Sequence, residues 1–387
     1  MMSNWIPYGH QRIEEDDIQA VSEVLRSDWL TTGPEVEKFE RALADTCGAR
    51  YAIVLNSGTA ALHAAYFAAG VGPGDEVITT PLTFAATANA ALYLGARVVF
   101  ADIEPGTGNI SAAEVEAKLS SRTKVVAPVD YAGHPADLDN ILASAHSAGA
   151  VVVEDACHAL GGRYQGRPIG SIADLTVFSF HPVKHITTGE GGAVLTNNPE
   201  YAEQIRSFRT HGITKQKQSV DENGPWFYEM RELGYNYRLP DILCALGRSQ
   251  LSKLHSFISR RKAIAEKYFE LLSDTPGLIL PTVHAEADPA WHLFVVRTKN
   301  EKMRRPLVET LRAAGIGVQV HYIPVYWHPF YQENRDLWDG NCSQAERFYR
   351  SCISLPIYPG LDDPDVEFVA NTIKGFFEDD SWSIERG

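Results

Sequence analysis

A single lysine stands in a run of residues that is poorly suited to a solvated surface. The run is His181-Pro182-Val183-Lys184-His185, and the glycine-rich segment Gly189-Glu190-Gly191-Gly192 follows it. A lysine that is desolvated, or close to other cations, becomes nucleophilic and can form a Schiff base with an aldehyde. The glycines allow a ligand to approach the backbone closely. Lys184 is therefore the candidate nucleophile, and the alternative is an ordinary basic loop.

A carboxylate stands at the end of a strongly apolar run. Val151–Val153 is followed by Glu154-Asp155-Ala156-Cys157-His158. Because burying an aspartate without a partner is unfavourable, such a position calls for a cation nearby. The protonated nitrogen of an aromatic ring would be such a cation, so Asp155 is a candidate ligand-binding residue. The alternative is an aspartate that caps a helix.

Two further segments contain residue types that bind a phosphate and a flat ring. Asn56-Ser57-Gly58-Thr59 opens an alanine-rich helix, and the free N–H groups at such a helix start bind phosphate. Pro81-Leu82-Thr83-Phe84 places an aromatic ring after another apolar run, where it can stack on a heterocycle. The alternatives are an ordinary N-cap and a core aromatic. The four segments together call for a phosphate, an aldehyde and a flat ring with a basic nitrogen, and pyridoxal 5′-phosphate (PLP) meets each requirement.

Seven apolar runs must position these residues, and they alternate with helix-like segments in the first two-thirds of the chain. Nearly continuous apolar runs are typical of strands covered on both faces. The predicted strands are Tyr51–Leu55, Glu76–Thr80, Arg97–Ala101, Lys124–Val129, Val151–Glu154, Leu175–Phe180 and Ala193–Thr196. Alternation with helices predicts an α/β fold with a mainly parallel seven-stranded sheet. Ligands bind at the carboxyl ends of such strands, where the candidate residues follow.

The pattern changes after Pro240, and the length of the chain also favours two domains. The elements expected there are a helical stretch over Ile242–Leu272 with a break near Gly247, a strand over Trp291–Arg297, a helix over Arg305–Ala314 and a strand over Gly317–Tyr322. We therefore expect a large PLP-binding α/β domain over residues 1–245, including an N-terminal segment that contacts substrate. A smaller C-terminal α+β domain is expected over residues 246–387.

The composition argues against several classes of protein. A formal net charge of −14 disfavours a protein that coats nucleic acid or an anionic membrane surface. The longest apolar stretch, Thr83–Ile103, is interrupted by Asn89, Arg97 and Asp102, and the N-terminus lacks the features of a signal peptide. The five cysteines are scattered, without a C-x-x-C pair. The sequence therefore predicts a cytoplasmic protein with no membrane span and no metal.

These segments resemble the vitamin-B6-dependent aminotransferases of nucleotide-linked keto sugars (DegT type), which have the fold type I architecture of aspartate aminotransferase. The resemblance extends from Tyr8 to about Pro356, and its most specific blocks are Asn56–Thr59, Glu154–Ala159, Ser179–Gly192 and Gly234–Leu239. It implies a PLP-dependent transaminase that acts as a homodimer with shared active sites and uses L-glutamate as amino donor.

The resemblance also implies a substrate. Ser179–Val194 and His321–Val325 look most like the C4 aminotransferase of pseudaminic acid biosynthesis. This implies conversion of UDP-2-acetamido-2,6-dideoxy-β-L-arabino-hex-4-ulose to UDP-4-amino-4,6-dideoxy-N-acetyl-β-L-altrosamine, with release of 2-oxoglutarate. His185 departs from the family at a variable position, which bears on sugar specificity.

Individual roles follow from the same resemblance. Lys184 is implied to bind the cofactor's aldehyde, and Asp155 to face its pyridine nitrogen. Further cofactor contacts are implied for Gly58, Thr59, Phe84, His158, Ser179 and Asn236, the last of these from the partner subunit. Substrate contacts are implied for Tyr8, Asp28, Trp29, Leu30, Thr31, Ser57, His321, Tyr322, Ile323 and Pro324.

Three alternative functions remain. The same fold could aminate another nucleotide keto sugar, such as UDP-4-keto-6-deoxy-GlcNAc or a GDP or dTDP sugar. A dehydratase of this fold has histidine in place of the lysine, so Lys184 argues against it. A cofactor-binding regulator without catalysis is disfavoured by the complete set of Lys184, Asp155, Thr59, Ser179 and Asn236.

Overall fold

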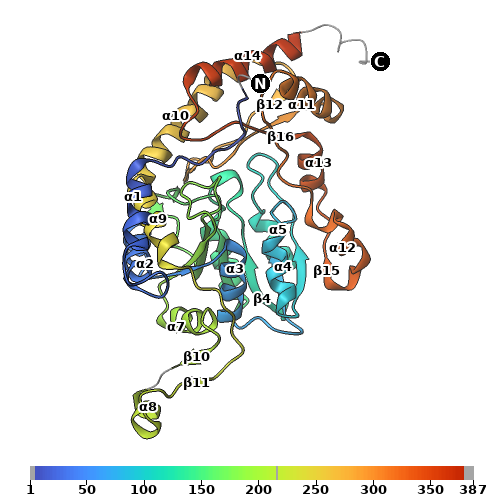
Figure 1. Ribbon diagram of the computed structural model, residues 1–387. Coiled ribbons are helices and arrows are strands. Elements are labelled where there is room, and N and C mark those ends of the chain that lie inside the picture. Colours follow the sequence, from blue (N-terminus) through green and yellow to red (C-terminus); the bar gives the residue numbers. More distant parts are fainter. Residues whose placement is uncertain (1–4, 215–216, 379–387) are drawn as a thin grey trace.

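The centre of the computed structural model, which describes residues 5–214 and 217–378, is an eight-stranded sheet (Figure 1). Its strands lie in the order β1-β9-β8-β5-β4-β2-β3-β15. Their bounds are β1 (Tyr51–Leu55), β2 (Glu76–Thr79), β3 (Arg97–Phe100), β4 (Thr123–Ala127), β5 (Val151–Asp155), β8 (Leu175–Ser179), β9 (Gly192–Thr196) and β15 (Trp338–Asp339). Only β9 runs antiparallel to its neighbours. The predicted α/β fold is confirmed, and the short β15 is an addition from the C-terminal part.

Helices cover both faces of this sheet because its strands are apolar on both sides. In β1, Ile53 and Leu55 face one core, whereas Ala52 and Val54 face the other. The first core is completed by α3 (Gly58–Ala68), α4 (Ala86–Tyr93) and α7 (Pro199–Phe208). The second is completed by α2 (Pro34–Cys47), α5 (Ala112–Lys118), α6 (Leu138–Ser147) and α9 (Asp241–Ser252).

The C-terminal part has a core of its own, at the top of Figure 1. Three helices pack there beside a small antiparallel sheet of order β12-β14-β16. The elements are α10 (Leu254–Leu272), α11 (Arg304–Ala313), α14 (Asp363–Glu378), β12 (Leu278–Ile279), β14 (Phe294–Thr298) and β16 (Cys352–Leu355). Two further helices flank β15 in the chain. The helix α12 (Pro329–Glu333) precedes β15, and α13 (Ser343–Ser351) leads from β15 back to β16. This part has the predicted α+β character, and the boundary at residue 245 stays a prediction.

Two predicted details of the C-terminal part are wrong. The long helix breaks at Lys253, between α9 and α10, and not near Gly247. Gly247 lies inside α9, where a Cβ atom would come within 2.5 Å of the Phe39 ring, so this glycine permits close helix packing. The strand expected over Gly317–Tyr322 does not form, since its backbone bonds are divided between Ile6 and Ser354. The third strand of the small sheet is β16 instead.

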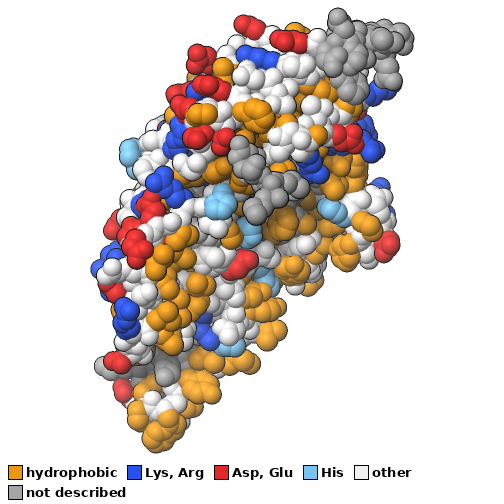
Figure 2. Space-filling model, turned by 45° about the horizontal axis from the view of Figure 1, so that its top comes forward, with side chains coloured by type: hydrophobic (Ala, Val, Ile, Leu, Met, Phe, Trp, Pro, Cys, Tyr) orange, Lys and Arg blue, Asp and Glu red, His pale blue; other side chains and the backbone are white. Residues whose placement is uncertain are grey.

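The remaining α-helices and strands lie outside the large sheet with its covering helices and outside the C-terminal core. They are α1 (Glu15–Leu25), β6 (Arg163–Tyr164), β7 (Arg167–Pro168), β13 (Ala287–Asp288), β10 (Ile213–Thr214), α8 (Lys217–Asn223) and β11 (Glu229–Met230). The segment of β10, α8 and β11 projects from the body at the bottom of Figure 1, and hydrophobic side chains gather on this end in Figure 2. Within the described residues, no helix has both the length and the apolar character needed to cross a membrane.

Candidate active site

A cavity of about 450 Å³ lies at the carboxyl ends of β1, β5 and β8. Eleven of the residues predicted from the sequence line it, although they come from widely separated segments. These residues are Tyr8, Ser57, Gly58, Thr59, Phe84, Asp155, His158, Ser179, Lys184, His321 and Tyr322. The structure therefore brings together the candidate nucleophile, the carboxylate and the phosphate-type turn in one site.

Seven predicted residues do not line this cavity. Asp28, Trp29, Leu30 and Thr31 are exposed between α1 and α2, and Asn236 is exposed in the loop before α9. Ile323 is exposed and Pro324 buried just beyond the cavity-lining Tyr322. The predicted roles of these seven residues therefore need either a second subunit or a substrate that extends out of the cavity.

The start of α3 forms a cradle at one end of the cavity. The Ser57 hydroxyl accepts a hydrogen bond from the N–H of Ala60 over 3.0 Å, which caps the helix. The first N–H groups of a helix have no partner within the helix, and here they come from cavity-lining residues. A Cβ atom at Gly58 would lie 3.0 Å from the Cβ atom of Ser179, so glycine keeps the space between α3 and β8 open. Such a cradle fits a phosphate group.

Asp155 ends β5 and is held by two donors. Its Oδ2 accepts from the Thr87 hydroxyl over 2.6 Å, and its Oδ1 accepts from the N–H of Cys157 over 3.2 Å. The Thr83 hydroxyl lies 2.9 Å from that of Thr87 and donates to it, because the single proton of Thr87 goes to Asp155. Asp155 is 6% exposed and has no ion-pair partner within the described part of the chain. A protonated ring nitrogen fits this carboxylate.

Lys184 is half-buried in the cavity wall. Burial lowers the pKa of its ammonium group, and the charge of Arg261 acts in the same direction. Cys157 and Asp155 oppose this effect. A lowered pKa increases the fraction of neutral amine, which is the form that attacks an aldehyde.

His158 supplies a buried ring nitrogen at the cavity. Its Nε2 lies 3.1 Å from the Tyr322 hydroxyl, whereas its Nδ1 has no partner among the described residues. Burial lowers the pKa of this imidazole well below its usual value, and the charge of Lys184 adds to the effect. A neutral imidazole at the cavity with one unpaired nitrogen fits a polar substituent on a bound ring.

Aromatic residues form the opposite wall. The Phe84 ring, 64% exposed, lies 6.4 Å from the Tyr322 ring, and the Tyr8 ring lies 5.7 Å from that of His321. Nδ1 of His321 lies 2.8 Å from the Ser354 hydroxyl, and burial lowers the pKa of His321 to about 4. The Tyr131 hydroxyl also donates to the carbonyl oxygen of His321. This wall therefore joins the large sheet to the C-terminal part.

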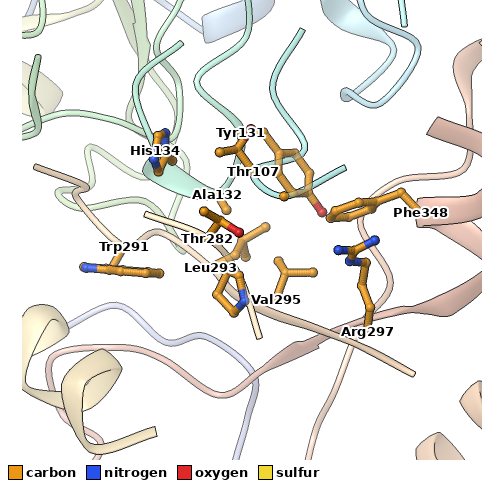
Figure 3. Close-up of a pocket in the computed structure, with 12 residues that line it drawn as sticks. Thr107, Tyr131, Ala132, His134, Thr282, Trp291, Leu293, Val295, Arg297 and Phe348 are labelled. Atoms are coloured by element: carbon orange, nitrogen blue, oxygen red, sulfur yellow. The ribbon is translucent and has the colours of Figure 1, made fainter. Parts of the chain in front are cut away.

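A second cavity, of about 20 Å³, lies between the same two parts (Figure 3). Trp291 and Leu293 line it, facing Tyr131 and Ala132. His292, the residue between them in the chain, lines the larger cavity instead. The turn at Trp291, whose φ is +51°, therefore directs neighbouring side chains into different cavities.

Several cavity residues were not predicted from the sequence. Thr83 and Thr87 are spaced by one helical turn, a pattern that could have indicated a shared face, but nothing in the sequence marks His292. His185, expected to bear on sugar specificity, is buried outside the cavity with its Nε2 3.1 Å from the carbonyl oxygen of Ala290. The described residues contain no group of three or more His, Cys, Asp or Glu side chains that could hold a metal ion.

Comparison with known proteins agrees with this site. The profile of the DegT/DnrJ/EryC1/StrS aminotransferase family matches residues 11–374. The chain belongs to this family. Its members use PLP, so the predicted fold type, cofactor and PLP-dependent sugar transaminase activity are confirmed.

Individual relatives cover nearly the whole chain. The spore coat polysaccharide biosynthesis protein SpsC of Bacillus subtilis is 42% identical over 96% of this chain and 97% of its own length. The UDP-4-amino-4,6-dideoxy-N-acetyl-beta-L-altrosamine transaminase of Campylobacter jejuni is 41% identical over 96% and 98%, respectively. The structure of Helicobacter pylori PseC, an aminotransferase in pseudaminic acid biosynthesis, superposes with a TM-score of 0.90 at 34% identity, covering 97% of this chain and all of PseC.

Proposed function

We propose that this sugar aminotransferase transfers the amino group of L-glutamate to C4 of UDP-2-acetamido-2,6-dideoxy-β-L-arabino-hex-4-ulose. The product would be UDP-4-amino-4,6-dideoxy-N-acetyl-β-L-altrosamine, with 2-oxoglutarate released. The observation that carries this proposal is the end-to-end similarity to the Campylobacter jejuni transaminase and to PseC, combined with a cavity that contains both Lys184 and Asp155.

The residues of the cavity suit the cofactor, and we assign their roles as part of the proposal. Gly58, Thr59 and Ser179 hold the phosphate at the start of α3. Asp155, ionised and fixed by its two donors, keeps the pyridine nitrogen protonated. His158 contacts the ring's phenolic oxygen. Phe84 and Tyr322, whose ring centroids lie 6.4 Å apart, cover the exposed face of the ring.

Lys184 is the residue that moves protons. When bound, PLP supplies an electron sink for the carbon atom that loses or gains a proton. The Nζ atom of Lys184, as a neutral amine, accepts the proton from the α-carbon of glutamate. In the second half-reaction the same atom donates a proton to C4 of the sugar. Because both substrates use one site in turn, ping-pong kinetics are expected.

Substrate recognition is assigned to the opposite wall. Tyr8, His321 and Tyr322 of this wall line the cavity and would contact the sugar, as would Ser57 at the start of α3. Ile323 and Pro324, together with the exposed turn Asp28–Thr31, lie outside it and would contact the nucleotide or a second subunit.

We also propose a homodimer in which Asn236 of one chain completes the phosphate site of the other. Asn236 is exposed and its side chain does not line the cavity of its own chain, although its carbonyl oxygen accepts from Nδ2 of Asn56 over 3.4 Å. Exposed apolar side chains lie nearby in the sequence, with Trp226 76% and Leu233 75% exposed. An exposed apolar patch marks an interaction surface, and a two-fold axis would use this surface twice.

A second candidate substrate is supported by the similarity to SpsC, which is as close as that to the altrosamine transaminase. Another nucleotide keto sugar, such as UDP-4-keto-6-deoxy-GlcNAc or a GDP or dTDP sugar, would then be aminated by the same residues. A panel of these keto sugars with L-glutamate separates the two, scored by product mass and by the configuration at C4 from NMR. Product from the L-arabino sugar at the highest kcat/KM supports the proposal. Faster turnover of any other sugar contradicts it.

A further inference from the structure

Arg261 is enclosed in the protein and has no carboxylate partner among the residues that the structure describes. It lies in α10 and is 0% exposed. Its Nη1 donates to the carbonyl oxygens of Trp291 (3.2 Å), His292 (3.3 Å) and Ile357 (2.9 Å). Its Nε and Nη2 have no hydrogen-bond partner in residues 5–214 and 217–378. A buried cation of this kind is unfavourable, and an apolar side chain of similar volume is often at least as stable. The burial of this charge therefore calls for a role other than stability.

The contacts to the carbonyl oxygens of Trp291 and His292 place Arg261 directly behind the turn that carries His292. The same turn is held by Nε2 of His185, 3.1 Å from the carbonyl oxygen of Ala290. The N–H of Ala290 also donates to the carbonyl oxygen of Gly133 over 2.9 Å. With Trp291 turned into the small cavity of Figure 3, His292 is directed into the cofactor cavity. The turn is therefore held both by Arg261 of α10 and by His185, the residue that follows Lys184 in the chain.

His292 connects this turn to the reacting groups. Its ring centroid lies 4.3 Å from that of His158 and 5.6 Å from that of His185. It is 5% exposed, and its Nδ1 has no hydrogen-bond partner in the part of the chain that the structure describes. Burial lowers the pKa of His292 well below its usual value, and the charges of Lys184 and Arg261 add to this effect. His292 is therefore a neutral side chain of the cavity wall.

We propose that Arg261 is a positioning residue of the active site, which holds His292 in the cavity wall and places its positive charge behind that wall. This inference rests on Lys184 being the reactive lysine of the proposed function. It does not depend on which sugar is aminated.

Burial has the largest effect on the pKa of Lys184, and the charged groups around it act in both directions. Asp155 and Cys157 favour the protonated lysine. Glu190, which also lines the cavity, is a further acidic residue. Three histidines of the cavity wall have a lowered pKa: His158, His292 and His321. His185, behind the cavity, also has a lowered pKa. His181 lines the cavity as well. The buried imidazoles of His158, His185, His292 and His321 are neutral, and the positive charge of Arg261 favours the neutral amine of Lys184 against Asp155 and Cys157.

The charge is tested in the holoenzyme without any substrate. The visible absorbance of the bound cofactor depends on the protonation of its nitrogen link to Lys184, so a pH titration reports on the local field. Arg261→Gln keeps a donor for the carbonyl oxygens and removes the charge. We expect its absorbance midpoint to rise by about one pH unit, which is a tenfold change in the protonation equilibrium. Arg261→Lys keeps the charge and should titrate near the wild-type midpoint.

Arg260→Gln is the matched control, because Arg260 is the neighbouring arginine but pairs with Asp363 at 2.8 Å on the surface. An Arg261→Gln midpoint equal to that of the control overturns the electrostatic part of the proposal. Should Arg261→Gln fail to fold, Arg261→Met replaces it with the same expected shift and the same contradicting result. If neither neutral variant folds, Arg261→Lys alone is compared with wild type. Because it keeps the charge, an absorbance midpoint one pH unit above that of wild type would contradict the proposal.

The holding role is tested by a double-mutant cycle on cofactor release. The rate at which the absorbance of bound PLP is lost on dilution is measured for Arg261→Gln, His292→Ala and the double variant. If Arg261 acts through His292, the double variant loses cofactor no faster than His292→Ala alone. Multiplicative acceleration contradicts this role. Neither readout uses a keto sugar, so failure of the proposed substrate and failure of this inference are distinguishable.

Discussion

The hydroxyl of Thr87 donates to Oδ2 of Asp155 over 2.6 Å, and this bond fixes the carboxylate at the end of β5. Thr87 is fully buried and receives a hydrogen bond from the Thr83 hydroxyl in turn, over 2.9 Å. Two hydroxyl groups from the start of α4 and the loop before it therefore orient the acid that we assign to the cofactor's ring nitrogen. A charge-assisted bond of this type contributes about 1.5–3 kcal/mol.

We therefore expect Thr87→Val, which removes the hydroxyl and keeps the shape, to slow the glutamate half-reaction roughly tenfold to a hundredfold. Stopped-flow absorbance of the holoenzyme mixed with glutamate measures this rate. Thr87→Ser is the matched control, because it restores the donor, and it should stay close to wild type. A Thr87→Val enzyme as fast as Thr87→Ser would remove the orienting role from this bond.

Lys184→Ala is expected to abolish turnover, since no other lysine of residues 5–214 and 217–378 lines the cavity. Borohydride treatment of the wild-type protein should attach the cofactor covalently, and peptide mapping by mass spectrometry should place it on Lys184. Lys262→Ala serves as control, because Lys262 forms a surface ion pair with Asp288 at 2.6 Å. Finding the reduced cofactor on a different lysine would refute the assignment.

Asp155→Asn and Ser179→Ala should damage different properties, because the two residues lie at different strand ends of the cavity. Asp155→Asn is expected to slow the glutamate half-reaction at least a hundredfold, since the ring nitrogen loses its carboxylate. Ser179→Ala is expected to raise the dissociation constant for PLP roughly tenfold, the effect of one hydrogen bond to a charged group. Equilibrium dialysis and stopped-flow measurements separate the two effects. The same pattern in both variants would contradict the assignment.

The shared site is tested with two inactive variants, Lys184→Ala and Asn236→Ala, mixed under conditions of subunit exchange. If Asn236 acts across the two-fold axis, each hybrid dimer contains one site with an intact Lys184 and an intact Asn236 of the partner subunit. Equal mixing then restores about a quarter of the wild-type activity, because about half of the dimers are hybrids with one working site. If Asn236 serves its own chain, beside Asn56, activity does not return although exchange is demonstrated by mass-tagged subunits.

The last prediction concerns stability and a buried pair of carboxyl groups, Asp130 and Glu154. Both are 0% exposed. Burial raises the pKa of Glu154 to about 7 and that of Asp130 well above its usual value. Because the folded-state pKa is raised, the stability contributed by Glu154 is present below the ordinary carboxyl pKa and is lost as the pH rises through about 7. Glu154→Gln should remove this loss.

Thermal unfolding between pH 5.5 and pH 8.5 measures the difference between Glu154→Gln and wild type. The variant should gain relative stability toward high pH, by up to about 1.4 kcal/mol per pH unit for one proton. Glu266→Gln, at an exposed position of α10, is the control and should run parallel to wild type. Parallel curves for Glu154→Gln as well would show that the carboxyl pair does not titrate in this range.

The floor of the cavity was predictable from the sequence, because Asp155 and Ser179 end apolar strands and the turn at Gly58 comes shortly after another. Such local patterns can be recognised from the sequence, because an apolar strand and the residue at its end lie within a few positions of each other. The glycine at 247 was misread as a helix break, because its function is a contact with Phe39 from a helix distant in the sequence.

The wall of the cavity was not predictable in the same way. His292 lines the cavity next to Trp291, which has a positive φ, and its carbonyl oxygen accepts from Arg261 of the distant helix α10. Thr87 becomes relevant only where α4 meets the end of β5. These relationships depend on tertiary packing, which overrides local propensity and leaves no periodic signal in the sequence.

The strand β15 ties the two parts of the protein together. Trp338 and Asp339 pair in parallel with Val98 and Val99, so the C-terminal chain supplies the outermost strand of the large sheet after it has formed the wall at His321 and Tyr322. An uncovered β3 would present an open edge, which invites pairing with other chains. The C-terminal part is thus not an interchangeable module: a natural or engineered exchange between relatives would carry the edge strand with it. Divergence of sugar preference on this scaffold is therefore expected to proceed by substitutions in the cavity wall and not by recombination of whole domains.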